Sequence, residues 1–243
     1  MKRLTVGGAP ARALLLPGND LPAAFYLPLA GALAARGLPT AVATLPGFDG
    51  EPPLAEPSWD ALAAAVLEDV PPVLIGHSMG GMLALRAAAR RPLGLTHLVL
   101  LEPAIFPWRW LARAAGRRYL RSVIRGDRDR FENWNGLSRR VADPARYPRA
   151  AIDLYLEARR RGDRATGEAL FSTLPDLYPL PEVAVPTLLV TGRETGARAR
   201  FLMRCLRARL GPAAWVELPG AAHWLVHEAD EAVAEQVARF VAV

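Results

Sequence analysis

The segment Gly76–Gly80, with the sequence GHSMG, constrains the fold of this chain more than any other part of the sequence. The apolar run Val73–Ile75 precedes it and is typical of a buried strand, and the helical stretch Met79–Arg91 follows it. Glycines at both ends of the segment permit a tight turn from strand to helix, and Gly81 permits the helix to pack closely. We therefore expect Ser78 at the start of a helix, where the helix dipole and free N–H groups stabilise developing negative charge.

Short apolar runs alternate with helical stretches along most of the chain. This alternation predicts an α/β fold with a mostly parallel sheet flanked by helices, because parallel strands need crossover connections. The runs are nearly continuous in Val, Leu and Ile, as expected for strands covered on both faces. The predicted strands are Lys2–Val6, Arg12–Leu16, Thr40–Leu45, Val73–Gly76, His97–Leu101, Thr187–Thr191 and Ala214–Leu218. The predicted helices of this part are Pro22–Arg36, Ser58–Asp69, Ser78–Arg91, Ala197–Leu210 and Asp230–Val241.

The strand pattern disappears between residues 103 and 180. Helical stretches at Trp110–Val123 and Arg149–Arg160 replace it, and the sheet pattern returns at Thr187. We expect residues 103–180 to form a helical cap over the carboxyl ends of the strands, where open parallel sheets bind their ligands. Residues 1–102 and 181–243 then form the core.

Positive charge is concentrated in the same segment. The whole chain has a formal net charge of +6, and residues 103–180 contain 16 Arg against 9 acidic residues. A solvated helical surface is the ordinary interpretation of such a pattern, and attraction of anionic ligands is the alternative.

Composition excludes several classes of protein. The 51% of hydrophobic residues is too high for a disordered chain, and no apolar run approaches the length of a membrane span. No run resembles a signal peptide, so we expect a cytoplasmic protein. The single cysteine, Cys205, excludes an internal disulfide, and four histidines without paired spacing argue against a metal site. No aromatic-basic motif indicates binding of nucleic acid.

The chain resembles the α/β-hydrolase family from Leu14 to Val241. The segment Gly76–Gly80 matches the nucleophile elbow of the family, G-x-S-x-G, with Ser78 as the nucleophile. His223 follows the last predicted strand and precedes the last helix, as the catalytic histidine of the family does. Gly18-Asn19 matches the loop that supplies an oxyanion donor, although Pro17 stands where the family usually has histidine. The resemblance implies an oxyanion hole made by the backbone N–H groups of Asn19 and Met79.

The acidic residue departs from the commoner pattern of the family. Most relatives place an aspartate three residues after the glycine that ends the penultimate strand, and that position holds Thr195 here. A subset of the family, which includes some haloalkane dehalogenases, places its acid one strand earlier, where this chain has Glu102. The resemblance therefore implies Glu102 as the acid, with Glu194 as the alternative. Dehalogenases carry aspartate as the nucleophile, so Ser78 argues against dehalogenation.

The resemblance implies a serine hydrolase that acts on a carboxylic ester or a related acyl compound, without metal or cofactor. A thioesterase, a proline-releasing aminopeptidase, a C–C bond hydrolase, an acyltransferase and a non-catalytic binding protein on the same scaffold remain open, and the oligomeric state is not determined. We expect some aromatic residues of the cap to line an apolar pocket for the acyl part of a small-molecule substrate. The candidates are Trp108, Trp110, Tyr119, Phe131, Trp134, Tyr147, Tyr155, Phe171 and Tyr178.

Overall fold

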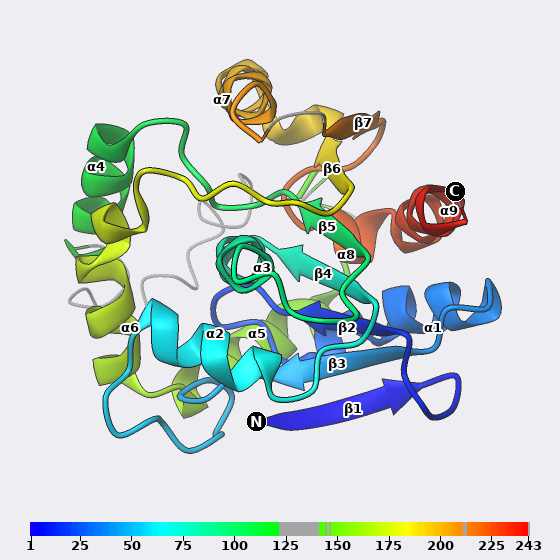
Figure 1. The fold of residues 1–243 in the computed structure, drawn as a ribbon, viewed down its shortest axis with the longest axis horizontal. Helices are drawn as coiled ribbons and strands as arrows, with labels where there is room; N and C mark the ends of the chain where they lie inside the picture. The colour runs from blue at the N-terminus through cyan, green and yellow to red at the C-terminus, as the bar shows by residue number, and fades with distance from the viewer. Residues whose placement is uncertain (122–140, 144, 146, 211–212, 243) are drawn as a thin grey trace.

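The computed structural model describes residues 1–121, 141–143, 145, 147–210 and 213–242. Within these residues one seven-stranded sheet forms the centre of the molecule (Figure 1). The strands are β1 (Lys2–Val6), β2 (Ala13–Leu16), β3 (Thr40–Thr44), β4 (Val73–His77), β5 (His97–Leu101), β6 (Thr187–Gly192) and β7 (Ala214–Leu218). The predicted strands are thus confirmed, with ends that differ by one residue at most.

The order of the strands in the sheet is β1-β3-β2-β4-β5-β6-β7. Strand β1 pairs antiparallel with β3, and the other neighbours pair in parallel. The chain moves outward from β2 to β3 and then returns to place β4 on the other side of β2. The carboxyl ends of β2 and β4 therefore meet where the direction of the connections reverses, which is the usual position of a ligand site in such sheets.

Nine α-helices are described. Six of them belong to the sheet-forming part of the chain: α1 (Leu27–Ala35), α2 (Trp59–Leu67), α3 (Met79–Ala88), α7 (Ala197–Arg207), α8 (Leu225–Glu228) and α9 (Asp230–Val241). The other three lie between β5 and β6: α4 (Arg109–Tyr119), α5 (Arg149–Arg161) and α6 (Arg164–Ser172).

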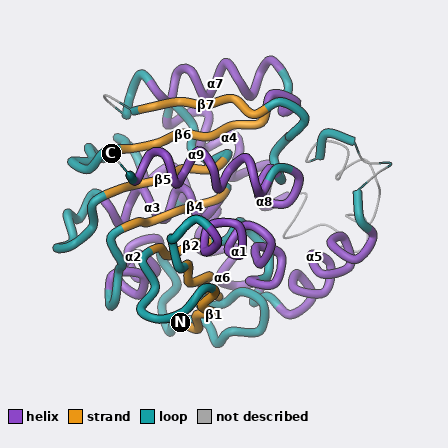
Figure 2. The backbone as a smooth tube through the Cα atoms, turned by 90° about the vertical axis from the view of Figure 1, so that its right-hand side faces the viewer, coloured by secondary structure: helices purple, strands orange, loops and turns teal. Residues whose placement is uncertain are grey.

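Alternate residues of the inner strands face two separate layers of the core. Ala13 and Leu15 of β2 pack in one apolar cluster with α1, α5, α8 and α9, whereas Leu14 and Leu16 pack in the other with α2, α3 and α7. Figure 2 shows α1 and α9 on the near side of the strands. Burial on both faces explains why the strands are almost entirely apolar.

One difference from the predicted helices has a local cause. The predicted helix Pro22–Arg36 begins instead as a 3₁₀ turn over Ala23–Tyr26, and α1 starts only at Leu27. Pro28 lies in the first turn of α1, and its nitrogen has no hydrogen to continue an α-helical ladder from the preceding residues.

Helix α6 has no counterpart among the predicted helices. The predicted helix Trp110–Val123 corresponds to α4, and Val123 lies outside the described residues.

The segment between β5 and β6, residues 103–180, contains helices and no strand in its described part. Helices α4 and α6 lie beyond the carboxyl ends of the parallel strands (Figure 1). Among the described residues, no helix is both long and apolar enough to cross a membrane.

Candidate active site

Ser78 lies at the turn from β4 to α3 with φ +52° and ψ −115°, a conformation that side-chain-bearing residues rarely adopt. Its neighbours leave no room for side chains at the two glycines of the motif. A Cβ atom on Gly76 would lie 2.3 Å from the carbonyl oxygen of Gly80, and one on Gly80 would lie 2.2 Å from that of Leu16. Close packing of backbone against backbone therefore requires glycine at both of these positions.

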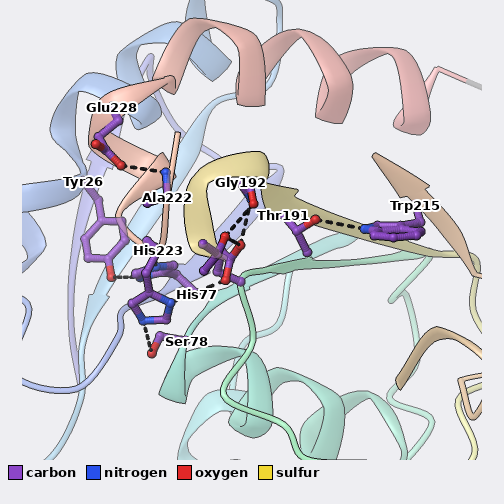
Figure 3. Close-up of polar contacts among 11 residues, drawn as sticks. Tyr26, His77, Ser78, Thr191, Gly192, Trp215, Ala222, His223 and Glu228 are labelled. Atoms are coloured by element: carbon purple, nitrogen blue, oxygen red, sulfur yellow. Dashed lines mark hydrogen bonds and ion pairs between the residues drawn. The ribbon is translucent and has the colours of Figure 1, made fainter. Parts of the chain in front are cut away.

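His223 lies next to this hydroxyl. Its Nε2 atom is 3.0 Å from Ser78 Oγ, a hydrogen-bonding distance, although 145 residues separate the two in sequence. The histidine follows β7, and the preceding backbone N–H, that of Ala222, donates to Glu228 Oε2 at 2.9 Å (Figure 3). Burial raises the pKa of Glu228, although hydrogen bonds from the backbone N–H groups of Ala222 and Ala142 act in the opposite direction.

Glu102 lies behind the histidine at the end of β5 and is 4% exposed. Its Oε2 atom is 3.6 Å from His223 Nδ1, which is within ion-pair distance but longer than a hydrogen bond. Its other oxygen, Oε1, accepts hydrogen bonds of 2.7 Å from the backbone N–H of Gly192 and from the hydroxyl of Thr195. The structure therefore brings Ser78, His223 and Glu102 together, with the ring of His223 in contact with both other residues.

Thr195 occupies the position where most relatives are expected to have the acid, and its hydroxyl contacts Glu102. The same hydroxyl is also within hydrogen-bonding distance of the Gly192 carbonyl, so its single proton serves one acceptor at a time. Glu194 is exposed, and its carboxylate accepts a 3.3 Å bond from the backbone N–H of Gly220. No described contact joins Glu194 to His223.

Asn19 and Met79 border the same cavity as Ser78. Met79 is the first residue of α3, and the first N–H groups of a helix have no partner within the helix. The side chain of Asn19 donates to Asp20 Oδ2 at 2.7 Å and also bonds to the hydroxyl of Tyr119. These contacts fix the loop after β2 beside the serine.

A cavity of about 420 Å³ opens above Ser78 between the sheet and residues 103–180. Apart from Ser78, Glu102, His223, Asn19 and Thr195, its lining is apolar or aromatic. The larger side chains in this lining are Leu21, Met79, Met82, Ile105, Phe106, Tyr119, Phe171, Leu174, Leu202 and Met203. Such a lining suits an apolar ligand that presents a polar centre to the serine.

Two of the nine aromatic candidates, Tyr119 and Phe171, line this cavity, and their rings stack on each other. The rings of Tyr147 and Tyr155 pack instead against Trp224 in the core. Trp108, Trp110 and Tyr178 lie outside the cavity lining. Phe131 and Trp134 lie outside the described residues.

The remaining histidines have separate surroundings. His77 is fully buried and bonds to Tyr26 and to the backbone of His223. His227 lies in α8, half-buried against the rings of Phe25 and Tyr147, and burial lowers its pKa. Among the described residues, no group of three or more His, Cys, Asp or Glu side chains is arranged to hold a metal ion.

Sequence reasoning missed three polar supports of this site: the hydroxyls of Tyr26 and Thr195 and the carboxylate of Glu228. Tyr26 follows an apolar stretch and is indistinguishable in sequence from an ordinary core residue. Glu228 lies five residues after His223, but nothing in the pattern shows that its carboxylate turns back to the histidine loop.

The model of the alpha/beta hydrolase family matches residues 13–236, which include every residue of the site. The chain belongs to the alpha/beta hydrolase family. The α/β-hydrolase fold expected from the sequence is thereby confirmed, and the seven-stranded, mostly parallel sheet agrees with it. No curated protein matches the chain in sequence.

Solved structures of hydrolases share this fold at low sequence identity. An esterase from Exiguobacterium antarcticum superposes with a TM-score of 0.79 at 15% identity, covering 99% of this chain and 95% of its own. MenH from S. aureus has a TM-score of 0.76 at 16% identity, with coverage of 99% and 97%. A hydrolase from Pseudomonas aeruginosa has a TM-score of 0.74 at 19% identity, with coverage of 99% and 94%. The family match thus identifies the chain as an alpha/beta hydrolase, and these structures share its fold.

Proposed function

We propose that this alpha/beta hydrolase cleaves a carboxylic ester with an apolar acyl group, and that Ser78, His223 and Glu102 form its catalytic triad. The observation that carries the proposal is the 3.0 Å contact between Ser78 Oγ and His223 Nε2, with the Glu102 carboxylate on the far side of the imidazole ring. A hydroxyl next to an imidazole, which is itself oriented by an acid, is the arrangement that activates a serine nucleophile.

The reaction begins when Ser78 Oγ attacks the ester carbonyl and His223 Nε2 takes the hydroxyl proton. The carbonyl oxygen becomes an oxyanion, which the backbone N–H groups of Asn19 and Met79 bind. His223 then gives its proton to the leaving alcohol, and the serine retains the acyl group as an ester. Water, deprotonated by His223, hydrolyses this acyl-enzyme. Glu102 keeps the histidine proton on Nδ1 and stabilises the imidazolium.

Residues 103–180 act in this proposal as a cap on a core of residues 1–102 and 181–243. The apolar cavity between them receives the acyl group, and the cap supplies Tyr119 and Phe171 to its wall together with smaller or aliphatic residues such as Ile105 and Leu174. The apolar lining favours apolar acyl groups over polar ones. Thioester hydrolysis and acyl transfer use the same acyl-enzyme and differ only in the leaving group and the acceptor.

A panel of p-nitrophenyl esters from acetate to palmitate tests the proposal, with acyl-CoA and dipeptide substrates as controls. Ester turnover and labelling of Ser78 by a fluorophosphonate probe are expected. Ser78→Ala should abolish both while the fold is retained, because in a serine protease the same change costs on the order of 10⁶ in kcat. Near-normal turnover in that variant would refute the serine mechanism. Absence of both labelling and turnover in the unmodified protein would indicate a binding protein.

A further inference from the structure

A chain of buried hydrogen bonds runs beneath the proposed triad. The backbone N–H of Gly18 donates to Tyr26 Oη at 2.6 Å, and Tyr26 Oη lies 2.7 Å from His77 Nδ1. On the other side of the ring, His77 Nε2 lies 2.8 Å from the carbonyl oxygen of His223. Figure 3 shows Tyr26, His77, His223 and Ser78 close together. Tyr26 and His77 are both fully buried.

The groups at the two ends determine the direction of every bond in this chain. A backbone N–H only donates, so Tyr26 Oη accepts from Gly18 and has its own proton left for His77 Nδ1. A backbone carbonyl only accepts, so His77 Nε2 must carry the proton that it shares with His223. A neutral His77 ring is therefore protonated on Nε2 and accepts from Tyr26 at Nδ1. This order is the single arrangement of a neutral ring in which all three bonds form at once.

These bonds connect three loops at the carboxyl end of the sheet. Gly18 precedes Asn19 in the loop after β2, His77 precedes Ser78 at the end of β4, and His223 follows β7. Ser78, His223 and Asn19 of the proposed mechanism thus each belong to this series of hydrogen bonds or lie next to a residue of it. His77 also lies beside the imidazole of His223, with ring centroids 5.2 Å apart.

We propose that Tyr26 and His77 are positioning residues, which hold the oxyanion loop and the His223 loop in register with the serine. This inference rests on the proposed function. Neither residue lines the cavity, so neither acts on the substrate directly. They act through the placement of Asn19 and His223, and misplacement of reacting groups by small distances is costly in rate.

Tyr26→Phe tests the first link. It removes the acceptor of the Gly18 N–H and the donor to His77 Nδ1, and buried polar groups left unpaired favour a shifted loop. We expect kcat per titrated active site to fall about tenfold, which corresponds to about 1.4 kcal/mol in the barrier. KM should remain unchanged because the cavity wall is untouched. Fluorophosphonate labelling should slow in parallel with kcat.

Tyr147→Phe is the matched control. Tyr147 is also a buried tyrosine in the same apolar cluster, and its hydroxyl has no hydrogen-bond partner among the described residues. Removing that hydroxyl should leave kcat and KM as they are. If the Tyr26 and Tyr147 variants have kcat values within twofold of each other, the positioning role of Tyr26 is refuted.

Two substitutions of His77 separate the two ends of its ring. A glutamine amide nitrogen is as many bonds from the backbone as Nε2, so His77→Gln retains a donor for the His223 carbonyl. An asparagine amide reaches only as far as Nδ1, so His77→Asn retains a partner for Tyr26 and loses the donor to His223. We expect His77→Gln to keep a kcat several-fold higher than His77→Asn. A purely structural role predicts equal kcat per titrated site for both.

Long-range ¹H–¹⁵N NMR of the imidazole groups tests the bond directions without any variant and without activity. His77 should give the signals of a neutral ring protonated on Nε2 at neutral pH. A ring protonated on Nδ1, or a charged ring, overturns the inference. A failure of the proposed function would instead be seen as ester turnover that survives Ser78→Ala, and it would leave the NMR result as it is.

Discussion

Glu102→Gln tests the choice of acid most directly, because the surroundings of Glu102 determine how the new amide must lie. Oε1 of Glu102 accepts a bond from the backbone N–H of Gly192. That N–H requires an acceptor, so the amide oxygen of the glutamine takes the place of Oε1. The amide NH₂ then faces His223 Nδ1 in the place of Oε2. A donor at this position stabilises the tautomer with its proton on Nε2, which cannot accept the proton of Ser78.

The size of the effect follows from the distance between the two charged groups. At 3.6 Å and an effective dielectric constant of about 20, a carboxylate and an imidazolium attract each other by about 4.6 kcal/mol. Loss of this attraction in the transition state corresponds to about 10³ in rate. The change of tautomer adds to it, and the same acid-to-amide change in a serine protease triad costs about 10⁴ in turnover. We therefore expect kcat to fall by about 10³ to 10⁴.

The assay is kcat for a p-nitrophenyl ester with thermal unfolding measured on the same preparation. Glu194→Gln is the control, since Glu194 is exposed. Within the described part of the chain, its carboxylate accepts a hydrogen bond only from the backbone N–H of Gly220. The kcat of this variant should remain within about twofold of the parent. Thr195→Asp in the Glu102→Gln background should recover part of the lost rate. The Thr195 hydroxyl lies 2.7 Å from the Glu102 carboxylate, so an aspartate at residue 195 would bring a new carboxylate close to the position of the lost one.

The opposite pattern of rates refutes this assignment. If Glu194→Gln abolishes turnover and Glu102→Gln is mild, the acid is Glu194 and the Glu102 carboxylate is only a support for the loop after β6. If both variants are mild, His223 works without an acid, and the Coulomb argument does not apply to this site.

Three further predictions address the cavity, the charge and the pH dependence. Ala199→Trp, which fills part of the cavity, should shift the preferred p-nitrophenyl ester to shorter acyl chains, whereas the exposed control Ala197→Trp should not; equal profiles would place the acyl group elsewhere. The net charge of +7 on residues 103–180 should raise kcat/KM for an anionic ester at low salt, and an equal salt response for a neutral ester would exclude such steering. Burial lowers the pKa of His227, so the folded protein favours its neutral form. The stability that the neutral ring contributes is present above about pH 6.5 and is lost as the pH falls, because the unfolded chain then binds the proton more readily. The Tm of the parent should therefore fall more than that of His227→Phe between about pH 7 and pH 5, and parallel curves would contradict this.

Whether a strand or helix can be predicted from the sequence depends on the types of residue on its buried face. The inner strands β2, β4, β5 and β6 are predictable because both of their faces are buried, which requires apolar runs such as Leu14–Leu16. Helix α6 is not predictable in this way. Its buried residues include Thr166 and Gly167 as well as Leu170 and Phe171, so the apolar spacing of a helix is absent from its sequence. Gly47 approaches Thr166 so closely that a Cβ atom on the glycine would lie 2.5 Å from its hydroxyl, which favours small residues at this contact.

The site shows a similar division. Ser78 and His223 are recognisable in sequence because the backbone around them imposes residue types, above all the glycines of GHSMG. The bond from Tyr26 to His77 imposes nothing on neighbouring positions, and it joins residues 51 apart through the packing of α1 and the 3₁₀ turn against the sheet. Such a contact depends on tertiary structure alone, so no local pattern could have shown it.

The position of the proposed acid, Glu102, at the end of β5 has a structural reason. Strands β5 and β6 are parallel neighbours, and the backbone N–H of Glu102 donates to the carbonyl of Val190 at 2.9 Å. The end of β5 therefore lies beside the turn that follows β6, and a carboxylate can approach His223 Nδ1 from either strand. Glu102 adopts φ +42° to do so, a conformation that costs on the order of 1–3 kcal/mol for a residue other than glycine. The bonds from Gly192 and Thr195 to its carboxylate offset this cost, so the triad proposed here favours a hydroxyl donor at residue 195 over an apolar side chain.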